Sequence, residues 1–284
     1  MIDDIKKVAG VVDAVVKVAK AVGGTEDGKQ AVEELGKTAL TVTRLVNNAL
    51  LPLAAVNYGF DKAKQYFKEQ FPEDMQARVK EIPEEQLVAP KPSIAGQALQ
   101  GLAYSHEEIE LKNLYLGLLA KAMDKRTASS THPAFVEIIR QLSAQEIEIL
   151  TKTLAFETDL AIVEIHLVEP DRTYRTLRRH ILDLRNVVTQ SPVETPKIEM
   201  YVANWRRLGL VEVDYTKHLN PAAEVYGPFD SRPEFIEAKQ KNETETSKVV
   251  LERGILHRTQ FGRDFARAVG MLDPILPSAS RTAA

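Results

Sequence analysis

The first residues that could do chemistry are Glu164 and His166, which lie two positions apart. On a strand this spacing places both side chains on one face, where a carboxylate and an imidazole could share a metal ion. A metal site needs three or four convergent ligands, and the sequence supplies no third partner for this pair. We therefore expect an ordinary pair of strand residues and predict no metal site.

His132 is the second candidate, because the hydroxyl residues Ser129, Ser130 and Thr131 precede it. Hydroxyls beside a histidine can indicate a nucleophile with its general base. This group comes directly before a predicted helix, however, where Thr131 or a neighbour would cap the free amide hydrogens. Capping is the interpretation that we favour, and no catalytic residue is predicted.

The familiar catalytic and cofactor-binding motifs are missing from the sequence. Neither of the glycine-rich phosphate loops, GxGxxG and GxxxxGKS/T, occurs, and neither does HExxH or GxSxG. The chain has no cysteine, which excludes disulfides, thiolate catalysis and cysteine-ligated zinc. These observations predict a protein that is not an enzyme and uses no cofactor.

The densest positive charge lies in two groups that are candidate contacts for nucleic acid or for a protein partner. The first group belongs to residues 172–189, which look like a basic helix, and arginine forks suit phosphate recognition. The second lies on one face of the next predicted helix, opposite Trp205, where a recognition helix would meet a DNA groove. The candidate residues are Arg172, Arg175, Arg178, Arg179, Arg185, Lys197, Asn204 and Arg207.

The overall charge argues against nucleic acid as the partner of these groups. The chain of 284 residues has a net charge of −3, so its global field does not attract polyanions. Asp183, Glu194 and Glu199 also lie close by in the sequence and could pair with the basic residues. A solvated face, a protein partner or self-association is therefore favoured, and DNA binding stays an open alternative.

Helical periodicity dominates the elements that would position these residues. Apolar residues recur at helical spacing from Leu111 to Met123 and from Phe135 to Leu142. The segments Ser105–Glu108 and Ser143–Glu146 match the pattern of a capping box at a helix start. Leu160–Val168 is rich in β-branched residues and is predicted to be a short strand.

The C-terminal part resembles the end of a winged-helix pattern. A helix that carries Trp205 precedes one short strand, Leu210–Val213, and a second strand, Gly254–His257, precedes another helix. The connection, residues 214–253, is too long for a wing, so an added helix is expected at Pro233–Lys241. We therefore predict a mainly α fold, in which a helical domain ends in a winged-helix-like element with a small β wing.

Prolines and composition predict how the chain is divided. With 44% hydrophobic and 27% charged residues, the chain can bury a core, and its length allows two modest domains. Three prolines mark a linker. The predicted regions are a helical N-terminal region (1–80), a proline-rich linker (81–93), a helical core region (94–190), a winged-helix-like region (191–272) with an insert (215–250), and a tail (273–284).

The N-terminal residues carry an amphipathic stripe but no predicted membrane span. Residues 2–22 could lie on a membrane, although their apolar face is mostly valine and alanine, which favours packing against other helices. The most apolar stretch, Ala39–Phe60, is interrupted by polar residues and a proline. Residues 1–7 contain two aspartates and do not resemble a secretion signal. These features predict a cytoplasmic protein.

A resemblance to a known family rests on the segment Leu111–Leu150, which reads LKNLYLGLLAKAMDKRTASSTHPAFVEIIRQLSAQEIEIL. This wording resembles the signature of the abortive infection alpha (Abi-alpha) family. Weaker similarity covers Leu35–Phe67, Ile82–Leu99, Asn204–Val213 and Leu256–Val269. The resemblance implies a part in abortive infection, in which infected bacteria arrest or die before the phage matures, and it implies no catalytic residues.

Three functions follow from the sequence. The leading hypothesis is a non-enzymatic phage-defence factor that acts through protein binding, as a sensor or as a toxic effector. One alternative is a DNA-binding regulator that uses the winged helix. The other is an effector that perturbs membranes through the N-terminal amphipathic helices.

Overall fold

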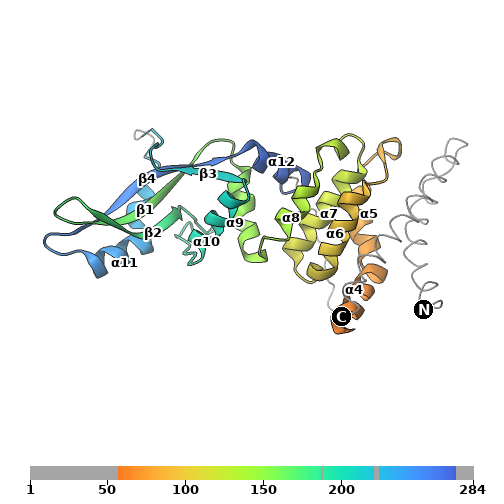
Figure 1. Ribbon diagram of the computed structural model, residues 1–284, viewed down its shortest axis with the longest axis horizontal. Helices are drawn as coiled ribbons and strands as arrows, with labels where there is room; N and C mark the ends of the chain where they lie inside the picture. The colour runs from red at the N-terminus through yellow and green to blue at the C-terminus, as the bar shows by residue number, and fades with distance from the viewer. Residues whose placement is uncertain (1–56, 187, 221–223, 273–284) are drawn as a thin grey trace, which may run out of the picture. The chain divides into compact units, whose positions relative to one another are not determined.

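The structure is a computed structural model that describes residues 57–186, 188–220 and 224–272 (Figure 1). The predicted amphipathic stripe of residues 2–22 and the predicted tail of residues 273–284 lie outside these ranges.

The described chain forms two compact units, which we call the helical unit and the sheet unit. The sheet unit is Lys152–Arg263, and the helical unit comprises the residues on either side of it in the sequence. The boundaries fall within two helices, Ala144–Ala155 and Gln260–Ala268. The sheet unit is therefore an insertion in the sequence of the helical unit.

The helical unit is built of short helices joined by tight turns. They are α4 (Asn57–Glu69), α5 (Phe71–Val79), α6 (Pro92–Ser105), α7 (Ile109–Met123), α8 (Pro133–Ile139), the start of α9 (Ala144–Ala155) and the end of α12 (Gln260–Ala268). Two 3-10 turns, η2 (Glu84–Gln86) and η3 (Ala128–Ser130), lie in the connections. Among the described helices, none combines the length and the apolar character needed to cross a membrane.

The core of the helical unit centres on α7, where Leu111, Leu114, Tyr115, Leu118 and Leu119 are buried as their periodicity predicts. Gly101 on α6 lies against the ring of Tyr115, which a Cβ at position 101 would overlap. Gly117 likewise leaves no room for a Cβ beside the carbonyl group of Val269, just after α12. These two glycines let the neighbouring segments approach α7 closely.

Only one of the two predicted capping boxes exists. The amide of Ser143 donates a hydrogen bond of 2.7 Å to Glu146 Oε1 at the start of α9, which confirms that box. The box predicted at Ser105 is wrong, because Ser105 is the last residue of α6 and its hydroxyl donates to the Gly101 carbonyl instead. The next helix, α7, begins only at Ile109.

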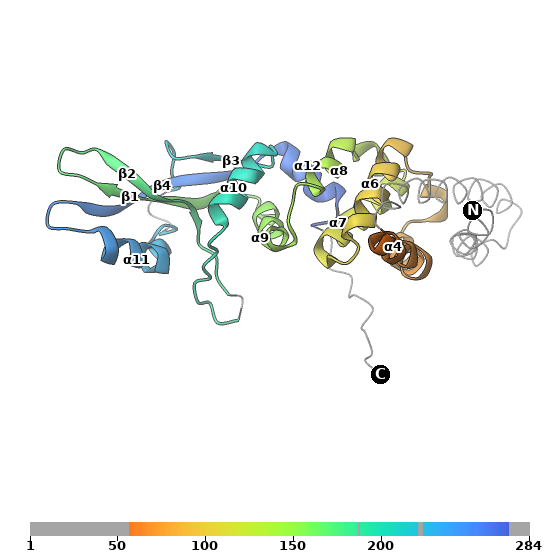
Figure 2. The same ribbon diagram turned by 60° about the horizontal axis from the view of Figure 1, so that its bottom comes forward.

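The sheet unit contains four antiparallel strands in the order β2-β1-β4-β3, which places β2 and β3 at the edges (Figure 2). The strands are β1 (Leu160–Val168), β2 (Tyr174–Leu182), β3 (Val211–Asp214) and β4 (Lys248–Arg258). Two helices, α10 (Ile198–Arg207) and α11 (Pro233–Asn242), and a 3-10 helix, η5 (Gly227–Ser231), complete the unit.

The register of the sheet assigns its side chains to two faces. Ile162, Glu164 and His166 alternate along β1 and therefore share one face, which we call the histidine face. On β4 the residue opposite Ile162 is Gly254, so that position belongs to the same face. The pairing of β1 with β2 shifts on both sides of Ile165, so β2 carries two irregularities.

The predicted fold class is wrong, because the chain is mixed α/β rather than mainly α with a small wing. Residues 174–182, expected in a basic helix, form strand β2, and β4 begins six residues earlier than the predicted strand at Gly254. The extended β4 pairs with every residue of β1, from Lys248 to Leu256. A four-stranded sheet therefore replaces the wing, while the helix predicted at Pro233–Lys241 is confirmed by α11.

Candidate functional site on the sheet

The arginines of the first basic group lie along the edge strand β2 instead of one helical face. Arg175 and Arg178 pair with Leu167 and Ile165, so both lie on the face opposite the histidine face. Arg172 precedes β2 in the β1–β2 turn, where it has a φ of 68°. Alternation along a strand has therefore divided a cluster that a helix would have kept together.

Three of these guanidinium groups make no close polar contact within the described chain, although the charge of Arg178 acts on Glu237. No hydrogen bond or ion pair within 4.0 Å joins the side chain of Arg172, Arg175 or Arg178 to another described residue. Arg179, by contrast, approaches Glu164, with 3.9 Å between Nε and Oε1. The edge strand thus presents arginines whose hydrogen-bonding capacity is not used internally.

The remaining candidates lie elsewhere and do not join this group. Arg185 follows β2 and donates to Asp183 and to the carbonyl oxygen of Gln190. Asn204 accepts a hydrogen bond of 2.7 Å from Arg207 on α10, and Lys197 is the residue just before that helix. Of the eight candidates, only the four arginines of β2 and its preceding turn are therefore neighbours, and they are divided between the two faces of the strand.

Helix α10 packs against the sheet rather than standing out as a recognition helix. Trp205 is 0% exposed, in agreement with the predicted apolar stripe. Glu199 Oε1 accepts a hydrogen bond of 2.9 Å from the backbone amide of Arg179, which fixes α10 to β2. The winged helix predicted around α10 is therefore replaced in the described residues by a four-stranded sheet.

Glu164 and His166 share the histidine face, as their spacing predicts. Both are buried, and His166 Nε2 lies 2.9 Å from Glu164 Oε2. The ring of Tyr174 stacks on His166 with centroids 4.5 Å apart and an interplanar angle of 10°. Since Tyr174 itself is 64% exposed, the buried pair supports an aromatic ring at the surface.

A second histidine, His180, is held by a tyrosine that sequence reasoning missed. Tyr215 stacks on His180 at 6.0 Å, and its hydroxyl lies 2.9 Å from His180 Nδ1. Burial, and then the charge of Arg206, lower the pKa of His180, while burial raises the pKa of Tyr215. One indication of this contact was present in the sequence, a glycine within a predicted strand. Gly254 has no side chain, and the Tyr215 ring fills the space that a side chain would take.

Arg232 is a further residue that the sequence did not single out. It is 2% exposed and donates to the carbonyl oxygens of Leu184 and Val193, each at 2.8 Å. Its guanidinium also pairs with Glu234 at 2.6 Å. These bonds attach the segment between β2 and α10 to the start of α11, which is a structural role.

His132 caps a helix, as expected for this group of residues. Its Nδ1 accepts a hydrogen bond of 3.1 Å from the amide of Ala134 at the start of α8. The neighbouring Thr131 hydroxyl donates to the Ala128 carbonyl at 2.7 Å.

Within the described residues, no three His, Asp or Glu side chains form a group that could hold a metal ion.

Chemically, the edge strand offers binding groups at the surface and acid–base groups that are already paired with one another. Tyrosine and arginine are enriched in protein interfaces, where a ring and a planar donor fork contribute most of the affinity. The exposed ring of Tyr174 and the guanidinium groups of Arg172, Arg175 and Arg178 therefore form the candidate site, which we call the β2 surface.

Comparison with known proteins agrees with the resemblance found in the sequence. The family model described as abortive infection alpha matches residues 63–269, which include most of the helical unit and the whole sheet unit. No curated protein and no solved structure gives a significant match. Since the family model covers well over half of the 284 residues, the chain belongs to the abortive infection alpha family.

Proposed function

We propose that this protein is a non-enzymatic phage-defence factor that acts by binding another protein, as a sensor or as a toxic effector. Membership of the abortive infection alpha family supports the defence role. The observation that carries the binding mode is the β2 surface, where Tyr174, Arg175 and Arg178 lie on an edge strand and Arg172 lies in the turn before it.

Binding is favoured over catalysis because three histidines of the described sheet and helices have structural partners. His166 is hydrogen-bonded to Glu164, His180 to Tyr215, and His132 to the amide of Ala134. A general base has to reach a proton on the substrate. A side chain that caps a helix or supports a surface ring is committed to structure instead.

Phage plating tests the proposal. Bacteria with and without the expressed gene are infected at high and at low ratios of phage to cell, and both plaque number and host survival are scored. Abortive infection predicts fewer plaques together with death or arrest of infected cells at the high ratio. Equal plaque numbers with and without the gene, across a panel of phages, would contradict the defence role.

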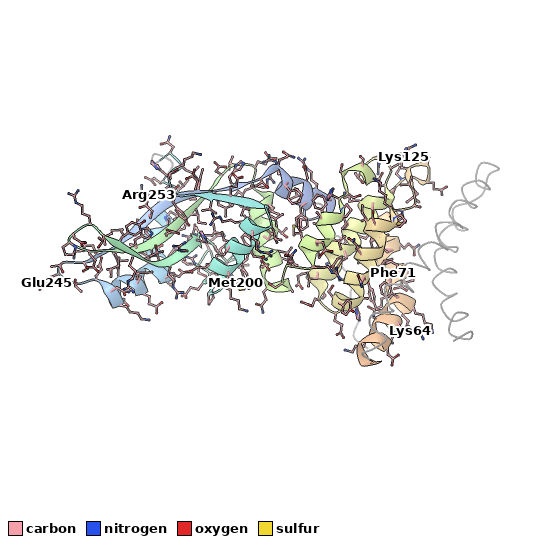
Figure 3. All side chains as sticks on the ribbon, viewed as in Figure 1. Lys64, Phe71, Lys125, Met200, Glu245 and Arg253 are labelled. Carbon is pink, nitrogen blue, oxygen red and sulfur yellow. The ribbon has the colours of Figure 1, made fainter. Side chains whose placement is uncertain are left out.

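Two charge-reversal variants test the binding mode in the same assay. Arg175→Glu/Arg178→Glu changes the β2 surface, whereas Lys80→Glu/Lys125→Glu makes the same change in net charge at exposed positions of the helical unit (Lys125 is labelled in Figure 3). Protection should be lost in the first variant and kept in the second. Equal protection by both would contradict the assignment of the binding mode to β2.

A further inference from the structure

The outer side of β2 has the features of a strand-addition site. β2 is an edge strand that pairs only with β1 in the sheet, so its other side presents backbone groups to solvent. In Figure 2 the β1–β2 hairpin extends from the sheet, and no other described strand lies along the outer side of β2. An extended segment of another chain can pair with such an edge.

The charges on β2 restrict which segment could pair there. Arg175 and Arg178 point to one face of the sheet and form no hydrogen bond or ion pair within 4.0 Å with another described residue. The pKa of Glu237 on α11 is lowered by its hydrogen bond with Lys241 and also by the charge of Arg178. The two arginines would therefore repel a basic segment and attract an acidic one. Charged side chains on edge strands commonly prevent non-specific pairing. Here they make the edge selective, because only a segment that neutralises the arginines can approach.

A carboxylate of the protein itself already binds a backbone amide on this edge. Glu199 accepts the backbone amide of Arg179 at 2.9 Å, just beyond the segment Tyr174–Arg178. An acidic oxygen therefore binds an edge amide beside the arginines in the folded protein. The contact also closes one end of the edge, which leaves residues 174–178 for a partner.

The two faces of β2 predict an alternating pattern in that partner. A segment paired with β2 would place every second side chain on the face of Arg175 and Arg178, and the others on the histidine face beside Tyr174. The first set should be acidic, and the second should be apolar to contact the exposed tyrosine ring. Glutamate or aspartate alternating with apolar residues is the expected sequence.

We infer that the outer edge of β2 binds an extended acidic segment of a partner protein, added as a strand to the sheet. The inference rests on the proposed function, because it names the partner chemistry of the β2 surface. Nucleic acid is disfavoured, because the net charge of −3 gives the whole chain a field that does not attract polyanions.

Fluorescence polarisation with a defined probe tests the inference on the full chain. The probe is a labelled nine-residue peptide, as long as β2, that alternates glutamate with valine. Binding should be salt-dependent, and Arg175→Glu/Arg178→Glu should weaken it about tenfold or more. The variant Lys80→Glu/Lys125→Glu should bind within about twofold of the unchanged protein, because its altered charges lie outside the sheet unit.

Three further ligands separate the alternatives. A peptide with N-methyl groups at alternate amides keeps the charge but cannot pair as a strand, and equal binding of this peptide would overturn strand addition. Binding of single-stranded oligothymidylate in place of the acidic peptide would overturn the choice of a protein partner. A peptide with lysine in place of glutamate should not bind.

The outcomes also separate this inference from the proposed function. Absence of binding to the glutamate peptide at low salt overturns the inference, even if the gene still protects against phage. Protection by a variant that has lost peptide binding would likewise remove the β2 edge from the defence mechanism. Failure of the unchanged gene to protect would overturn the proposed function, whatever the peptide shows.

Discussion

Arg232 and Glu234 form a buried ion pair at the start of α11, with hydrogen bonds of 2.6 Å and 3.0 Å between the guanidinium and the carboxylate. The same guanidinium binds two backbone carbonyl oxygens from the segment that follows β2. All three guanidinium nitrogens of Arg232 therefore donate to protein atoms, and the side chain is only 2% exposed.

Replacing Arg232 with methionine should lower the free energy of unfolding by about 3–5 kcal/mol, because it leaves the Glu234 carboxylate buried and unpaired. Urea denaturation measures the effect. Arg267→Met, at a side chain that is 67% exposed, is the control and should change stability by no more than about 0.5 kcal/mol. If the Arg232 variant loses less than about 1 kcal/mol, the pair does not stabilise the sheet unit.

Trp205→Ala should destabilise the protein by about 3–5 kcal/mol, because it removes the largest fully buried side chain and leaves a cavity under α10. Thermal and urea unfolding both report the change. Met200 lies on the same helix and is exposed, so Met200→Ala should have little effect. Similar losses for the two variants would contradict the orientation of α10.

Gly254→Ala should cost about 1–3 kcal/mol, because the added methyl group overlaps the ring of Tyr215. Removing the ring in the double variant Gly254→Ala/Tyr215→Ala should make the glycine substitution much less harmful. A double-mutant cycle by urea unfolding measures this coupling. If the changes in the free energy of unfolding were strictly additive, the position of the Tyr215 ring would not depend on the space that Gly254 leaves.

Acidification should destabilise the protein, because burial lowers the pKa of His180 and His106 from the ordinary value of 6.5. Below about pH 6.5 the unfolded chain takes up protons that the folded chain still excludes. The free energy of unfolding should therefore fall as the pH decreases from that value, until the folded-state pKa is reached. The slope cannot exceed about 1.4 kcal/mol per pH unit for each histidine.

Urea denaturation at about pH 7.5 and about pH 5.5 measures this dependence. His180→Asn should reduce the slope, and asparagine tolerates the φ of 59° found at this position. An unchanged slope in this variant would show that His180 is not the group responsible. A flat profile in the unchanged protein would contradict both assignments.

Phage protection should survive the loss of the Glu164 carboxylate charge. Glu164→Gln removes the carboxylate that pairs with His166 but keeps a group of the same size, so protection should stay within a few fold if the role is binding. His132→Ala should behave likewise, provided that α8 stays folded by circular dichroism. A loss of protection of about a hundredfold or more in a stably folded Glu164→Gln protein would indicate acid–base catalysis.

The sequence predicts the helices well because their apolar residues recur without interruption. The stripe of α7 and the buried face of α10 with Trp205 follow directly from spacing, and proline marks the start of α11. Strand β2 could not be recognised in this way, because its two irregularities break the alternation that identifies a strand. Its arginines and leucines have good helix propensity, so the helical interpretation prevailed.

Only those features of the candidate site that depend on neighbouring residues in the sequence could be predicted. Two residues of spacing are enough to place Glu164 and His166 on one face. The stacking of Tyr174 on His166 and of Tyr215 on His180 depends on how strands pair, and Tyr215 lies 35 residues beyond His180. The arginines of β2 were chosen for their charge, but their division between two faces follows from the strand register.

The insertion of the sheet unit between two parts of the helical unit has a consequence for the order of folding during synthesis. Phe265 packs edge-to-face against Phe135, with centroids 5.7 Å apart, and Val269 lies against Gly117. The helical core therefore stays incomplete until α12 has left the ribosome, by which time the whole sheet unit has already emerged. A nascent chain that stops after β4 can contain a finished sheet but exposes the apolar side chains that α12 would cover.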